Sequence, residues 1–227
     1  MSEVYLYDEI VQEKYKDWDG VEHGFAPDDL AKELHAAEKD DTVDIFVNSP
    51  GGSVFAAVAM TSEIKRASQR GVKVNAHVDG IAASAASFLI MACDSVNMYD
   101  GTMLMVHKPM SFCFGNADDM LKCAEDLEQI LDGTCMPMYR SKLKGDDEEL
   151  KALIAKESWL SARQAAEIFE ITIKDGSKDA KDLLDASVIA KFGYKNVPKQ
   201  LIRQEKPKEA PAKVDYTEFE KRINNIH

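Results

Sequence analysis

Residues 79–87 hold the serine whose setting best suits nucleophilic chemistry. They read Asp-Gly-Ile-Ala-Ala-Ser-Ala-Ala-Ser, between a β-rich run at 72–78 and an apolar run at 88–92 that is typical of a helix. We therefore expect Ser84 where a strand turns into a helix, next to free N–H groups and the positive end of the helix dipole. This setting suits a serine that attacks a carbonyl and stabilises the resulting oxyanion. Taken alone, small residues at a helix start more often serve close packing.

Three further features offer groups that could act with Ser84. Residues 49–53 (Ser-Pro-Gly-Gly-Ser) follow a predicted strand, and their glycines can aim backbone N–H groups at an anion. His107 stands at another predicted strand end, and Glu157 comes just before Ser-Trp-Leu. Each feature alone is more typical of ordinary structure: a glycine-rich turn, a structural histidine and a solvated carboxylate. The glycine loop also lacks the G-x-x-x-x-G-K-[ST] pattern of a phosphate loop.

The elements that must position these groups alternate between strands and helices, so the predicted fold class is α/β. A strand at 43–47, a helix at 56–67 and a strand at 72–78 indicate a βαβ unit with a right-handed crossover. The other predicted elements are strands at 3–10, 95–99 and 103–106, and helices at 27–38, 116–142, 146–155, from Ser161 onward and at 182–192.

Domain organisation follows from a change in composition near the C-terminus. Residues 1–202 are predicted to form one globular domain. Residues 203–227 have a linker composition with prolines and alternating charges, followed by a short amphipathic helix pattern. Within the domain, the 116–142 helix carries one apolar face, and Pro137 is expected to kink it. The residues of that face are Met120, Ala124, Leu127, Leu131 and Met138.

Composition excludes several classes of function. The chain has 227 residues and a formal net charge of -12, which disfavours nucleic acid as a partner because phosphate binding needs a basic surface. We see no apolar run of about 18 residues for a membrane span and no signal peptide, so we expect a cytoplasmic protein. Cys93, Cys113, Cys123 and Cys135 show no C-x-x-C spacing and are interpreted as free thiols of a reducing cytosol, without a zinc site.

The order of these motifs along the chain resembles the Clp-type serine peptidases, the ClpP family of the crotonase-like superfold. The matching pieces are Ser-Pro-Gly-Gly-Ser at 49–53, G-x-A-A-S-A-A at 80–86, M-x-H-K-P at 105–109 and Glu-Ser-Trp-Leu-Ser-Ala-Arg-Gln-Ala at 157–165. The resemblance spans about residues 43–171. The stretches 114–119 and 157–159 are more similar to the branch encoded in phage and prophage genomes than to the housekeeping branch.

The resemblance implies a fold of repeated β-β-α units with a protruding handle at about 115–142. It also implies that Ser84 is the nucleophile and His107 the general base. The third member of the triad is usually an aspartate, and the matching position here is Glu157, which is one methylene longer.

The same resemblance implies the remaining site residues. The backbone N–H groups of Gly52 and Ala85 form the oxyanion hole, and Gly51 and Ser53 contact the substrate. Neither a metal nor an organic cofactor is required.

The family also suggests partners. We expect a protein or peptide substrate and homo-oligomeric rings that interleave through the handle. Housekeeping relatives use an N-terminal loop to engage an ATPase unfoldase, whereas residues 3–7 here already have a strand pattern. We therefore expect cleavage of flexible chains without obligatory ATPase coupling. In the phage branch the substrate is expected to be a capsid or scaffold protein processed during head maturation.

Several alternatives remain open. An acyl-CoA hydratase or isomerase of the same superfold would need neither the serine nor the histidine. A Ser–Lys peptidase would use Lys108, which should point to the opposite face of its strand from His107. The chain could instead be a housekeeping-like peptidase that works with an unfoldase, or an inactive ring-forming structural protein.

Overall fold

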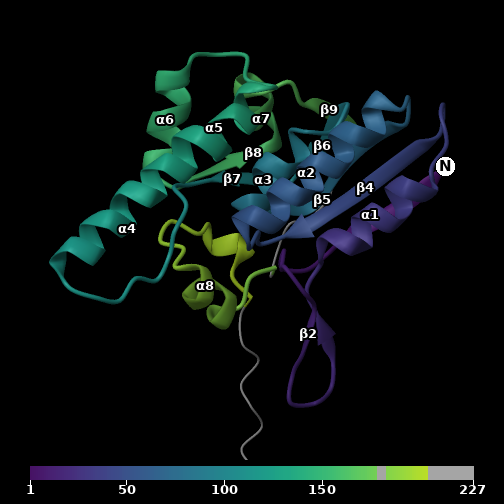
Figure 1. The fold of residues 1–227 in the computed structure, drawn as a ribbon. Helices are drawn as coiled ribbons and strands as arrows, with labels where there is room; N and C mark the ends of the chain where they lie inside the picture. Colours follow the sequence, from purple (N-terminus) through teal and green to yellow (C-terminus); the bar gives the residue numbers. More distant parts are fainter. Residues whose placement is uncertain (178–182, 204–227) are drawn as a thin grey trace, which may run out of the picture.

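A seven-stranded sheet runs through the computed structural model, which describes residues 1–177 and 183–203 (Figure 1). Neighbouring strands follow the order β1-β4-β5-β6-β9, while β7 pairs with both β5 and β8. These pairings are parallel except that between β7 and β8, which is antiparallel. The predicted α/β class is therefore confirmed.

The described strands and helices have the following bounds. The strands are β1 (Ser2–Leu6), β2 (Tyr15–Lys16), β3 (Glu22–His23), β4 (Thr42–Ser49), β5 (Lys73–Ala83), β6 (Ser95–Asp100), β7 (Met103–Val106), β8 (Ser158–Ser161) and β9 (Thr172–Ser177). The helices are α1 (Pro27–Ala36), α2 (Val54–Gln69), α3 (Ala85–Ile90), α4 (Ala117–Ile130), η1 (Leu131–Cys135), α5 (Met136–Arg140), α6 (Asp147–Ala155), α7 (Ala162–Ile168), α8 (Ala186–Phe192) and η2 (Lys199–Leu201).

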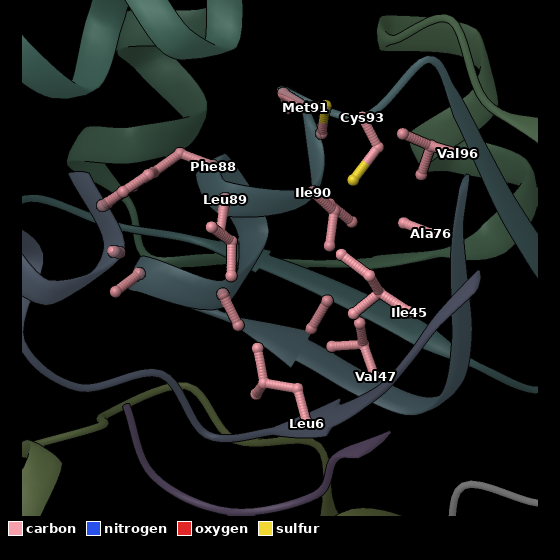
Figure 2. Packing of buried hydrophobic residues seen from close by; sticks show 14 of the residues in the cluster. Leu6, Ile45, Val47, Ala76, Phe88, Leu89, Ile90, Met91, Cys93 and Val96 are labelled. Carbon is pink, nitrogen blue, oxygen red and sulfur yellow. The ribbon is translucent and has the colours of Figure 1, made fainter. Parts of the chain in front are cut away.

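The main hydrophobic core joins the sheet to the helices that cover it. Ile45 and Val47 project from β4 toward the helix that carries Leu89 and Ile90, and all four side chains are at most 1% exposed (Figure 2). All six residues of α3 are buried. The turn between β5 and α3, which contains Ser84, is therefore anchored in the core on both sides.

Most predicted elements are confirmed, but β5 is longer than the 72–78 strand that we expected. It continues through Asp79 and Gly80 to Ala83, because the amide oxygen of Asn48 accepts the Ile81 backbone N–H at 3.2 Å and bridges an irregularity in the ladder. Side-chain alternation could not reveal this bond. The β2–β3 hairpin and strands β8 and β9 were also not predicted.

The long helix predicted at 116–142 consists of three consecutive segments. α4 is followed by the five-residue π-helix η1 and then by α5, in which Pro137 occupies the first turn. Proline has no N–H to donate back to the preceding turn, which accounts for a local change of helix type. Figure 1 shows α4 extending away from the sheet, and no residue of α4 is buried.

The cysteines require a correction. Cys113 and Cys123 form a disulfide with a Cα–Cα distance of 6.5 Å, so the expectation of four free thiols was wrong. The loop after β7 folds back along α4, and this nonlocal contact cannot be deduced from spacing alone. Cys93 and Cys135 are free and buried, as expected.

The predicted tail helix and nearly all of 203–227 lie outside the described residues, as does the start of the 182–192 helix. Among the helices of residues 1–177 and 183–203, none is long and apolar enough to cross a membrane.

Candidate active site

Ser84 lies at the junction of β5 and α3, as predicted, and its backbone conformation is unusual. Its φ of 53° and ψ of -121° are rarely adopted by residues other than glycine. The conformation is held by hydrogen bonds on both sides. The Ser84 N–H donates to the Met105 carbonyl at 3.0 Å, and the Ser84 carbonyl accepts from the Ser87 N–H at 2.9 Å. The structure therefore directs one serine out of an otherwise buried turn.

His107 follows β7 and reaches the Ser84 side chain. Strand β7 runs parallel to β5, with Ala83 paired to Met105, so the residues just beyond both strand ends lie side by side. The His107 Nε2 and the Ser84 Oγ are 2.7 Å apart. This distance is suitable for proton transfer between a serine nucleophile and an imidazole base.

The environment of His107 favours the neutral imidazole. Burial lowers the pKa of His107 below its ordinary value, while the nearby Glu157 carboxylate acts in the opposite direction. A general base must be unprotonated to accept the Ser84 proton, so burial supports that function at neutral pH.

Glu157 lies close to His107 because of the antiparallel ladder between β7 and β8. The last pair of this ladder is Val106 with Ser158, and the next residues along the two strands are His107 and Glu157. Glu157 has a φ of 51°, another conformation that residues other than glycine rarely adopt.

The Glu157 carboxylate nevertheless binds backbone donors rather than the imidazole. Oε1 accepts from the N–H groups of Lys195 and Asn196 at 2.8 and 2.7 Å, and Oε2 accepts from that of Lys195 at 3.0 Å. The Trp159 indole donates to Oε1 at 3.4 Å. Within the described part of the chain, no hydrogen bond joins Glu157 to His107.

The glycine loop approaches Ser84 closely. A Cβ added to Gly51 would lie 2.7 Å from the Ser84 Cβ, and a Cβ on Gly52 would overlap the Ile10 backbone. Both glycines have positive φ, at 96° and 145°. Glycine is therefore needed at both positions to bring this backbone to the serine.

The other two predicted site residues lie on either side of this loop. Ala85 is the first residue of α3, so its N–H has no acceptor within the helix. Ser53 is the N-cap of α2, and its Oγ accepts from the Ala56 N–H at 3.2 Å. The Ser53 side chain thus serves the helix start.

A cleft of about 390 Å³ opens beside the Ser84–His107 pair. Its walls come from the glycine loop, the segment after β7 and helix α8. Its lining includes Gly52, Val54, Met110, Phe112, Lys191 and Phe192. Local sequence patterns do not predict the α8 wall, because that helix lies about a hundred residues from Ser84 along the chain.

Tyr194 is the residue near the site that sequence reasoning missed. Its ring meets that of His107 edge-on, with 5.5 Å between the ring centroids. A single tyrosine after Gly193 belongs to no recognisable motif, so only the tertiary structure reveals this contact. Among the described residues, no cluster of three His, Cys, Asp or Glu side chains could hold a metal ion.

The fold and the site together define an α/β protein with a hydrogen-bonded serine–histidine pair at the edge of a cleft. A family model described as "Clp protease" matches residues 26–169, more than half of the chain. The chain belongs to the Clp protease family. The parallel sheet and its covering helices are consistent with the ClpP-like fold, and membership supports a serine peptidase of the ClpP type.

Individual relatives are distant. An "ATP-dependent Clp protease proteolytic subunit 2" of Pseudomonas aeruginosa is 25% identical over 159 residues, covering 65% of this chain and 73% of the relative. An "ATP-dependent Clp protease proteolytic subunit" of Bacteroides thetaiotaomicron is 26% identical, covering 62% of this chain and 64% of the relative. An "ATP-dependent Clp protease proteolytic subunit 2" of Mycolicibacterium paratuberculosis is 28% identical, covering 62% of this chain and 73% of the relative.

Proposed function

We propose that this chain is a serine endopeptidase that hydrolyses peptide bonds through an acyl-enzyme on Ser84. The observation that carries the proposal is the 2.7 Å contact between the Ser84 Oγ and the His107 Nε2 beside an open cleft. The reaction begins when His107 takes the Ser84 proton and the alkoxide attacks the substrate carbonyl. His107 then gives the proton to the leaving amine, and water releases the acyl group.

The oxyanion is held by backbone N–H groups in this proposal. The donors are Gly52, on a loop that only glycine can form, and Ala85, at the start of a buried helix. Removal of one such donor typically costs about 3 to 4 kcal/mol of transition-state stabilisation. No metal or organic cofactor takes part, because Ser84, His107 and these donors supply every proton transfer and charge contact.

We propose that the active form is a homo-oligomer built partly through the handle, residues 115–142. Helix α4 exposes Met120 and Leu121, and none of its residues is buried within one chain. An amphipathic helix that extends from its own core is expected to bury its apolar face against another surface.

The substrate is proposed to be a flexible protein segment. Sequence features at 114–119 and 157–159, similar to the phage branch, favour a capsid or scaffold protein processed in a bacterial host. This step rests on family analogy rather than on site geometry. The names of the three relatives include "ATP-dependent", and this favours the second candidate, a peptidase that receives chains from an ATPase unfoldase.

One experiment tests the peptidase proposal directly. A fluorophosphonate probe is added to the purified protein, and the labelled residue is mapped by mass spectrometry. Label on Ser84, together with hydrolysis of a short peptide, is the expected result. Absence of label from the assembled protein would instead favour the inactive structural alternative, and acyl-CoA turnover by Ser84→Ala would favour the hydratase alternative.

A second experiment separates the two modes of substrate supply. An unstructured polypeptide and a stably folded protein are incubated with the enzyme without ATP or an ATPase. Cleavage of the unstructured chain alone is expected. A strict requirement for an added unfoldase, even with short unstructured chains, would support the second candidate.

A further inference from the structure

Tyr194 connects three parts of the site. Its ring is 6% exposed and packs edge-on against His107 and against Trp159, with centroids 5.5 and 5.6 Å away. Its hydroxyl donates to the carbonyl of Pro50. Tyr194 is not among the residues that line the cleft, although its neighbours Phe192 and Gly193 are.

The Pro50 contact matters because Pro50 precedes the two glycines that approach Ser84. Ile10 also holds this loop, because its N–H donates to the Gly51 carbonyl at 2.7 Å. The Tyr194 hydroxyl supplies a side-chain anchor from a remote part of the chain. Loss of that anchor would let the Gly52 N–H move relative to the oxyanion.

The backbone around Tyr194 is held on both sides. Gly193, with a φ of 59°, ends α8 in the left-handed conformation that glycine adopts readily. The Glu157 carboxylate accepts the next two backbone N–H groups, those of Lys195 and Asn196. The Asn196 side chain also donates to the Lys156 carbonyl at 2.7 Å. The Glu157 contacts thus form a clamp on the residues that follow Tyr194.

We propose that Tyr194 is a positioning residue for the Ser84–His107 pair and the glycine loop, and that Glu157 acts mainly by clamping the Tyr194 segment. The assignment rests on the proposed peptidase function. It explains why the carboxylate at the third triad position binds backbone N–H groups instead of the imidazole. It also gives the glutamate side chain, which is longer than the usual aspartate, specific partners in the N–H groups of Lys195 and Asn196.

The proposal predicts different effects for the ring and the hydroxyl. The Tyr194 ring keeps water from the imidazole, and this burial lowers the pKa of His107. Tyr194→Ala should therefore raise the His107 pKa toward its ordinary value. Tyr194→Phe keeps the ring and should leave that pKa unchanged, but it removes the bond to Pro50.

The first experiment compares Tyr194→Phe with wild type and with Tyr5→Phe, an exposed tyrosine whose hydroxyl bonds only locally to Glu3. We expect kcat/KM for a short peptide to fall roughly five- to tenfold in Tyr194→Phe, as for loss of one neutral hydrogen bond, with KM unchanged. Tyr5→Phe should behave as wild type. Turnover and Ser84 labelling of Tyr194→Phe at wild-type rates would overturn the inference.

A double-mutant cycle tests whether Glu157 acts through this segment. If the clamp is its main function, Glu157→Ala combined with Tyr194→Phe should lose no more activity than the more severe single variant. Fully additive losses would show that Glu157 acts on His107 independently, and the clamp assignment would be wrong.

An NMR titration of the His107 ring separates failure of this inference from failure of the peptidase proposal. The titration does not require an active enzyme, so it can be done even if the wild-type protein neither hydrolyses peptide nor reacts with the probe. A higher pKa in Tyr194→Ala and an unchanged one in Tyr194→Phe would support the contact. An unchanged His107 pKa in Tyr194→Ala would contradict it.

Discussion

The backbone N–H of Ser84 donates to the carbonyl oxygen of Met105 at 3.0 Å. This bond continues the parallel ladder between β5 and β7 by one residue beyond Ala83. It therefore sets the distance between the serine at one strand end and His107, two residues beyond Met105. The geometry of the Ser84–His107 pair therefore depends on the register of β5 and β7.

Ser84→Ala should abolish peptide hydrolysis while the fold and the assembly stay intact. Removal of a serine nucleophile typically costs on the order of 10⁴-fold or more in kcat. The substitution deletes one oxygen and leaves the Met105 bond in place. Peptide turnover, circular dichroism and native mass spectrometry check the three parts. Ser62→Ala on α2, where the hydroxyl bonds only to the Val58 carbonyl, is the matched control. Near wild-type turnover by Ser84→Ala would refute the nucleophile assignment.

The pH dependence of kcat/KM should reflect a neutral, buried base. Burial lowers the pKa of His107, so activity should rise with pH and the midpoint of this rise should lie below about 6.5, the ordinary imidazole value. Glu157 raises the pKa of His107, so Glu157→Gln should move the acidic limb to still lower pH and reduce the rate less than His107→Ala does. Kinetics from pH 4 to 8 measure the limb. A shift to higher pH in Glu157→Gln would contradict this sign.

Gly51→Ala should reduce the reactivity of Ser84 more than it reduces the stability of the fold. The new Cβ would meet the Ala83 carbonyl at 2.5 Å and the Ser84 Cβ at 2.7 Å, at a φ of 96°. Strain of this kind costs about 1 to 3 kcal/mol and displaces the loop beside Ser84. Thermal unfolding and the probe-labelling rate measure the two effects. Gly133→Ala is the control, because a Cβ there meets nothing within 4 Å. Equal behaviour of the two variants would argue against a close approach at Gly51.

Charges on the exposed face of α4 should reduce the assembly to smaller species. Met120→Glu with Leu121→Glu alters residues that are 38% and 65% exposed in one chain, so the chain itself should remain folded. Leu131 is unsuitable for this test because it is 6% exposed and belongs to the core. Light scattering measures the mass, with Val21→Glu, on a side chain that is 53% exposed outside the handle, as the control. A wild-type monomer would contradict the prediction.

The Cys113–Cys123 disulfide predicts the number of free thiols. Denatured, unreduced protein should show two free thiols per chain, those of Cys93 and Cys135. Cys113→Ser should expose the thiol of Cys123 and lower the free energy of unfolding by about 3 kcal/mol, the usual effect of opening a loop of this size. Thiol titration and chemical denaturation measure these outcomes. Four free thiols in protein purified without reductant would rule out the disulfide.

The sequence by itself determined the local elements and the candidates for chemistry. A short apolar run at 43–47 predicted β4, and the Gly-rich stretch that follows it predicted the loop at its end. The setting of Ser84 between a strand and a helix was recognisable because it depends only on neighbours in the chain. The motif order then pointed to His107 and Glu157 through resemblance to a family.

The tertiary structure alone decided how these groups meet. The Glu157 carboxylate binds backbone N–H groups 38 and 39 residues away, and the Tyr194 hydroxyl reaches a carbonyl 144 residues away. The pattern of side chains along the sequence does not predict such contacts, because every residue except proline offers the same backbone N–H donor. Strand β8 was not predicted because it has only four residues and follows Glu157, a charged residue that is typical of a helix end. Its strand conformation depends on pairing with β7 in the folded chain. Long-range register, rather than residue type, therefore set the geometry around Ser84.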